Sequence, residues 1–136
     1  MHIEITSALQ SALQAFSDAE RDLIAIGKRT DPERKFDLVQ HRRKFVEQMG
    51  LVSQMIDRDG ALQRRPEMVM EMNSRLSAFR FAIGQHQASW PAVRIDDDAA
   101  AYAESARGTY AKADRFWDWC SENLTFERHS AIFPSS

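Results

Sequence analysis

The sequence VMEMNSRLSAFRFAIGQHQASWP, from Val69 to Pro91, decides the fold. Apolar side chains recur in it at alternating steps of three and four residues, which is the spacing of one face of an α-helix. His86 continues this spacing at a position where a leucine is expected. The whole face consists of Val69, Met72, Leu76, Phe79, Ile83, His86 and Trp90. The stretch therefore predicts a long amphipathic helix that carries one imidazole on its core face.

The composition indicates a soluble protein without a general affinity for polyanions. The 136 residues have the length of one ordinary domain, which buries enough surface to fold without a disulfide or a metal. The 18 basic and 20 acidic side chains give a net charge of −2, so we expect no nucleic-acid partner and no membrane partner. The single cysteine, Cys120, and a beginning, MHIEITSALQ, that does not resemble a signal peptide predict a cytoplasmic protein.

Three other stretches have the same helical periodicity, and each has a start signal. Thr6 or Ser7 precedes the first, Thr30 has capping-box spacing to Glu33 before the second, and Asp98 precedes the last. The predicted helices cover residues 7–27, 32–57, 66–89 and 97–123, followed by a short tail at 125–136. Four helices of similar length joined by short connections predict an all-α, single-domain, up-down-up-down antiparallel four-helix bundle over residues 1–136.

Two histidines are predicted to share one level of this bundle. His41 and His86 are equally far from the connection near residue 63, so antiparallel helices place them within about one helical turn, ~5.4 Å. The same reflection through the other connections brings further residues to this level, namely Asp18, Ala19, Glu20 and Asp22 in the first helix and Tyr102, Ala103 and Glu104 in the last. The small side chains of the last helix, Ala99, Ala103 and Ala106, leave room there.

This level is the candidate site. Neutral imidazoles and carboxylates suit iron, zinc or manganese, so the candidate ligands of a divalent metal or a small molecule are His41, His86, Glu104 and Asp22. The candidate lining residues are Arg42, Trp90, Tyr102, Ala103 and Ala106. The structural alternative is a buried His86 that is hydrogen-bonded to a carboxylate or to Tyr102, with His41 half exposed.

Several short motifs carry a family resemblance: AIGQHQASWP at Ala82–Pro91, FWDWC at Phe116–Cys120, IFP at Ile132–Pro134, and a histidine, His41, on the second helix. With them the chain resembles the hemerythrin-like (HHE) bundle family, which implies a four-helix bundle. The family's His-x-x-x-Glu pair would start at His86, but Trp90 stands at the glutamate position, and the outer helices supply no histidine. The resemblance therefore implies a degenerate member that has lost its di-iron centre and does not bind oxygen.

No catalytic constellation is found, so the first hypothesis is a non-catalytic bundle with a degenerate metal or small-ligand site in a regulatory or sensing role. The second is a protein-interaction adaptor or a homodimer, because Phe36, Phe81 and Trp119 lie opposite the core stripes of their helices. The third is phosphotransfer through His41, which has Lys44 one turn further on.

Overall fold

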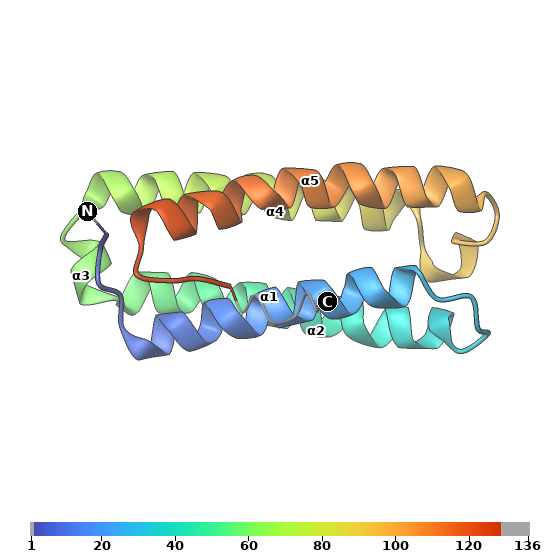
Figure 1. Ribbon diagram of the computed structural model, residues 1–136, viewed down its shortest axis with the longest axis horizontal. Helices are drawn as coiled ribbons and strands as arrows, with labels where there is room; N and C mark the ends of the chain where they lie inside the picture. Colours follow the sequence, from blue (N-terminus) through green and yellow to red (C-terminus); the bar gives the residue numbers. More distant parts are fainter. Residues whose placement is uncertain (1, 129–136) are drawn as a thin grey trace.

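The computed structural model describes residues 2–128, and this part of the chain is all-α. Its elements are α1 (Ser7–Gly27), α2 (Arg34–Arg58), α3 (Gly60–Gln63), α4 (Pro66–Ser89), the 3-10 helix η1 (Ala92–Arg94) and α5 (Ala99–Asn123). Figure 1 shows α1 and α2 side by side as one pair and α4 and α5 as a second pair. None of the helices within residues 2–128 combines the length and the apolar character that crossing a membrane requires.

The helix starts agree in two places with the expected capping residues and differ in one. Thr6 Oγ1 accepts a hydrogen bond from the Leu9 N–H at 3.2 Å, and an Asp98 carboxylate oxygen accepts one from the Ala101 N–H at 3.1 Å. The capping box expected between Thr30 and Glu33 is wrong: α2 begins at Arg34, and the Glu33 side chain makes no capping hydrogen bond. The turn before α2 is held instead by hydrogen bonds from the Arg29 guanidinium to the Asp31 carboxylate.

The connection between α2 and α4, which the sequence predicted only as a short connection between helices, contains a helical turn, α3. Asp59 explains this turn, because its buried carboxylate accepts hydrogen bonds from two backbone N–H groups. Oδ1 accepts from Leu62 at 2.9 Å and caps α3, and Oδ2 accepts from Thr6 at 2.8 Å. One side chain thus fixes the start of α1 against the connection between α2 and α4.

Replacing Asp59 with alanine is expected to lower the free energy of unfolding by about 1–3 kcal/mol, since two N–H groups lose their acceptor at once. Urea unfolding followed by circular dichroism measures the change. Asp57→Ala is the matched control, because Asp57 is an exposed carboxylate two residues away and should change stability by less than about 0.5 kcal/mol. Equal effects of the two substitutions would contradict this role of Asp59.

A layer of packed aromatic rings joins all four long helices. Phe16 of α1 lies at its centre, and its ring centroid is 4.9 Å from that of Phe45 in α2, 5.4 Å from Phe79 in α4 and 5.5 Å from Trp117 in α5. Phe16, Phe45 and Phe79 are buried almost completely. These ring contacts connect the α1–α2 pair with the α4–α5 pair.

The first half of α5 faces the core with a different stripe from the one that its alanines predicted. Ala99 and Ala103 are exposed, whereas Tyr102 and Thr109 are buried. Burial of these polar side chains is tolerated because their polar groups find partners; the Thr109 hydroxyl, for example, donates to the backbone carbonyl of Ser105 at 2.8 Å. The spacing of apolar residues along the helix did not predict this face, because two of its buried residues, Tyr102 and Thr109, carry hydroxyl groups.

Three aromatic side chains were expected on the surface, and two are there. Phe36 is 66% exposed and Phe81 69% exposed, but Trp119 is buried, with 6% of its surface exposed. The exposed position predicted for Trp119 is therefore wrong. Phe126, from the segment that follows α5, is buried as well, while the tail residues Ile132 and Phe133 lie outside the described residues.

The segment after α5 returns along α1 (Figure 1). Thr125 accepts a hydrogen bond from the Gln10 side chain through its backbone carbonyl at 2.9 Å, and the Arg128 guanidinium donates to the Ser17 hydroxyl at 3.0 Å. Ile3 also pairs with Leu124 in an isolated parallel bridge. The Arg128 guanidinium therefore lies beside the buried side chains of Ser17 and Glu20 on α1.

Candidate functional site

A cavity of about 570 Å³ lies between α1 and α5. This volume is within the range of small-molecule sites in proteins. Its walls are mainly apolar, formed by Leu23 and Ile24 of α1, Leu38 of α2, and Ala103, Ala106 and Ala111 of α5. The small side chains of α5 keep the space between the two helices open.

The basic end of the cavity is formed by Arg42, His86 and Tyr102. His86 Nδ1 forms a hydrogen bond with the Ser105 hydroxyl at 2.7 Å, and the imidazole stacks on the Tyr102 ring with 5.5 Å between centroids. Burial, and then the charge of Arg42, lower the pKa of His86 to about 4. The imidazole is therefore neutral at pH 7, and the inner positive charge at this end belongs to Arg42, since Lys28 and Arg107 line the cavity from exposed positions.

Arg42 is half buried, and its Nη2 atom has no hydrogen-bond partner in the part of the chain that the structure describes. Burial lowers the pKa of Arg42, although a guanidinium remains charged at neutral pH. A buried donor without an acceptor and a charge without a counter-ion are both unfavourable. The unpaired Nη2 is thus the polar group in the cavity that most needs a partner.

Tyr102 crosses from α5 to the end of α1. A Cβ atom placed on Gly27 would lie 3.0 Å from the Tyr102 hydroxyl, so a side chain at this position would push the tyrosine away. Gly27 therefore allows a close approach between the two helices at the basic end. Trp90 packs on the other side of Tyr102, with 5.8 Å between the ring centroids.

The acidic end of the cavity is formed by Glu20, Asp114 and Arg128. Glu20 lies seven residues before Gly27 on α1, about 10 Å along the helix from the basic end. It is 1% exposed; its Oε1 accepts a hydrogen bond from Trp117 Nε1 at 2.6 Å and lies 3.6 Å from the Arg128 guanidinium. Arg128 also lies above the Trp117 ring and 3.9 Å from the Asp114 carboxylate.

Burial raises the pKa of Glu20 to about 7, because it outweighs the charge of Arg128 and the hydrogen bond from Trp117. Burial also raises the pKa of Asp114, with Arg128 acting in the opposite direction. Tyr110 lies between the two ends, since Glu20 and Arg42 both act on its hydroxyl, whose pKa burial raises. The two ends of the cavity therefore differ: the guanidinium of Arg42 has no ion-pair partner among the described residues, whereas the carboxyl groups of Glu20 and Asp114 share the charge of Arg128.

Five residues expected at the site do line the cavity: Arg42, His86, Tyr102, Ala103 and Ala106. The hydrogen-bond partner of His86 is neither a carboxylate nor Tyr102, as the structural alternative proposed, but the hydroxyl of Ser105. Tyr102 contributes its ring face instead.

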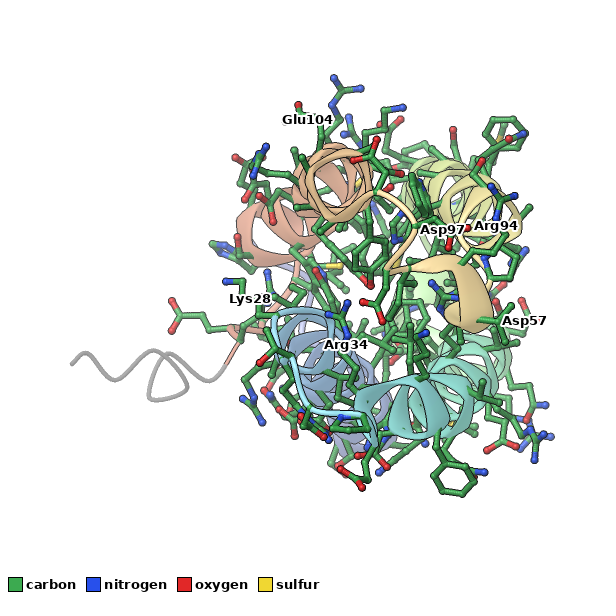
Figure 2. The ribbon with its side chains drawn as sticks, turned by 90° about the vertical axis from the view of Figure 1, so that its right-hand side faces the viewer. Lys28, Arg34, Asp57, Arg94, Asp97 and Glu104 are labelled. Carbon is green, nitrogen blue, oxygen red and sulfur yellow. The ribbon has the colours of Figure 1, made fainter. Side chains whose placement is uncertain are left out.

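The other candidates lie elsewhere. His41 is half buried, and its Nδ1 lies 2.9 Å from the Asp37 carbonyl of its own helix; Arg42, the next residue, shares the cavity with His86. Glu104 points away from the helices at the end of the molecule shown in Figure 2, where it forms an ion pair with Arg107. Asp22 and Trp90 are partly buried, and neither is among the described residues that line the cavity.

Sequence reasoning missed several residues of the site, among them Ser105, Tyr110, Asp114 and Arg128. It placed Glu20 only at the rim, although Phe16, Glu20, Leu23 and Gly27 follow one another at helical steps of four, three and four. That spacing puts Glu20 on the core face of α1. For Arg128, which lies beyond the last helix, no periodic signal exists.

The residues around the cavity do not fit the metal centre that the hemerythrin-like resemblance brings to mind. Within residues 2–128, no group of three or more His, Cys, Asp or Glu side chains is arranged to hold a metal ion. The donor nearest to His86 is a serine hydroxyl, and the guanidinium of Arg42 repels a cation. Binding of iron or another divalent metal stays a prediction from the sequence.

Comparison of the chain with protein-family models, with curated proteins and with solved structures found no match.

Proposed function

We propose that this protein is a non-catalytic helical bundle that binds a small organic molecule in the cavity between α1 and α5, in a regulatory or sensing role. The fold proposed with it is an up-down-up-down antiparallel four-helix bundle, related to the hemerythrin-like family as a degenerate member. The paired helices and the ring layer around Phe16 support this arrangement.

The observation that carries the proposal is the meeting of a large apolar space with one unpaired polar group. The cavity of about 570 Å³ has mainly aliphatic walls, and the buried Nη2 of Arg42 lacks a partner among the described residues. Pockets for small molecules have this composition, with a few polar groups that fix the orientation of an otherwise apolar ligand. A cavity that was only a packing defect would lower the stability of the fold and serve no function.

The nucleophiles near this region support binding more than chemistry. Cys120 is buried, and burial raises the pKa of its thiol, so the reactive thiolate is disfavoured. His86 has one ring nitrogen engaged with Ser105 and a pKa of about 4, which makes it a weak base at neutral pH.

Filling the cavity should abolish binding. Ala106→Phe places a ring in the space between α1 and α5, so we expect that titration with 3-phenylpropan-1-ol or 3-phenylpropanoate, followed by calorimetry, loses its heat signal. Ala100→Phe is the matched control, because Ala100 is exposed on the same helix and should leave binding unchanged. Failure of both probes to bind the parent protein would contradict the proposal.

An interaction module is the second candidate function, and the exposed rings of Phe36 and Phe81 favour it. They lie on different helices, α2 and α4, and each is surrounded by solvent within the described chain. Homodimerisation through either ring would make sedimentation depend on protein concentration. Phosphotransfer through His41 stays a prediction.

A further inference from the structure

The charge distribution of the cavity narrows the class of ligand, if the proposed binding function is correct. Arg42 brings one positive charge to the basic end, and no carboxylate among the described residues forms an ion pair with it. The groups that act on its charge are Tyr102 and Tyr110. Both are phenols, so neither is a carboxylate counter-ion of Arg42.

The carboxyl groups of the cavity do not neutralise Arg42, because they are engaged at the other end. Glu20 accepts from Trp117 and lies near Arg128, and Asp114 also lies near Arg128. Glu20 is separated from the basic end by about 10 Å of helix. The guanidinium of Arg42 is therefore a preformed site for an anion, and the Tyr102 hydroxyl is a second donor beside it.

The rest of the cavity favours a ligand with one anionic group. Between the two ends the inner walls consist of Leu23, Ile24, Ala106 and the ring of Tyr110, which offer few partners for a second anionic group. Lys28 and Arg107 also line the cavity, but both are exposed, and Arg107 forms an ion pair with Glu104. At the acidic end the charge of Arg128 is already shared by Glu20 and Asp114. An anion with a single charge and an apolar body therefore matches the free charge of Arg42 and the apolar walls.

We propose that the ligand is an organic monocarboxylate, whose carboxylate accepts hydrogen bonds from Arg42 and Tyr102 and whose aliphatic or aromatic body lies along the alanines of α5. Arginine suits a carboxylate because its planar fork can donate two parallel hydrogen bonds. This proposal depends on the proposed binding function and adds the class of ligand to it.

The experiment compares pairs of probes with the same body and different head groups. Octanoate is compared with 1-octanol, and 3-phenylpropanoate with 3-phenylpropan-1-ol and 3-phenylpropylamine, by calorimetry at pH 7. We expect both carboxylates to bind at least about ten-fold more tightly than their alcohols, because a charge-assisted hydrogen bond is roughly twice as strong as a neutral one. The amine should bind most weakly.

The variant that tests the role of Arg42 is Arg42→Met, which keeps the length of the side chain and removes its charge. It should reduce the affinity for octanoate about 10- to 100-fold and leave that for 1-octanol unchanged. Arg42→Lys should give an intermediate loss, since it restores the charge without the fork. Arg43→Met is the matched control, because Arg43 is the next residue on α2 and is exposed.

The outcomes separate this inference from the function on which it depends. If the alcohols bind as tightly as the carboxylates and Ala106→Phe abolishes both, the cavity binds ligands but the carboxylate assignment is overturned. If inorganic phosphate alone binds as tightly as octanoate and competes with it, the apolar body plays no part and the assignment is also overturned. If no probe binds, both the function and the assignment fail.

Discussion

Replacing Phe16 with alanine is expected to lower the free energy of unfolding by about 3–5 kcal/mol, the range for deleting a buried ring from a packed core. The Phe16 ring contacts rings from α2, α4 and α5, so its loss leaves a cavity that all four long helices border. Domains of this size have a total stability of about 5–15 kcal/mol. The variant should therefore lose a large part of its free energy of unfolding and unfold at a lower denaturant concentration.

Guanidinium unfolding followed by tryptophan fluorescence measures this loss, since Trp117 lies 5.5 Å from Phe16 and reports on the layer. Phe81→Ala is the matched control: it deletes the same side chain from a site that is 69% exposed, and it should change stability by less than about 0.5 kcal/mol. If the two alanine variants were equally stable, the ring layer around Phe16 would not contribute to the stability of the fold in the way expected here.

Glu20→Gln is expected to make the protein more stable at pH 8 by about 1–3 kcal/mol. The pKa of Glu20 is about 7 in the folded protein against 4.5 in an unfolded chain, so folding favours the protonated acid. The stabilisation from this group is complete below pH 4.5 and is lost as the pH rises through 7. A glutamine keeps an oxygen that accepts the hydrogen bond from Trp117 and has no charge to bury.

The size of this effect follows from the shift, since one pKa unit corresponds to about 1.4 kcal/mol and the whole shift to about 3 kcal/mol. His86 acts in the opposite direction: its folded pKa of about 4 lies below the ordinary 6.5, so its contribution is present above pH 6.5 and is lost as the pH falls through 4. The difference between variant and parent isolates Glu20, because His86 is the same in both.

Thermal unfolding of the parent and of Glu20→Gln at pH values from 4 to 8 provides this difference. The two curves should coincide at pH 4; they should separate between pH 4.5 and 7 and run parallel above pH 7. Glu104→Gln serves as the control, because Glu104 is an exposed carboxylate on α5 and should follow the parent at every pH. A constant difference between variant and parent across the whole range would show that Glu20 is not titrating in the folded protein.

The helices followed from the sequence because their signals are local. Thr6 and Asp98 begin helices by accepting hydrogen bonds from N–H groups three residues further on. Pro91 ends α4 because its ring disfavours helical geometry at Trp90. The turn of α3 was missed although Asp59 caps it through the Leu62 N–H, which is also three positions away; the other bond of Asp59, to Thr6 53 residues earlier, carries no local signal. Such a contact exists only once the chain has folded.

The site was half predictable for the same reason. His86 stands out as a polar residue on an apolar face, and Arg42 was found as its neighbour across the α2–α4 connection. His41 was expected to face inward, but the next residue, Arg42, does so instead. An average helical repeat does not distinguish two adjacent positions at the edge of a face. Arg128 was out of reach, because its place depends on the path of the segment after α5 along α1.

The pairing of Ile3 with residues 123–125 has a consequence for how the molecule opens. The Ile3 N–H donates to the Asn123 carbonyl at 2.8 Å, and the Thr125 N–H donates to the Ile3 carbonyl at 2.9 Å, so each end of the described chain holds the other. Termini ordinarily fray independently of each other. Here the segment around Ile3 and the segment at 123–125 are expected to detach together. Arg128 follows Thr125 by three residues and borders the cavity. Loss of the hydrogen bonds between Ile3 and residues 123–125 would therefore also remove part of the cavity wall. If a ligand binds in this cavity as proposed, its binding should disfavour terminal fraying, and fraying should weaken its binding.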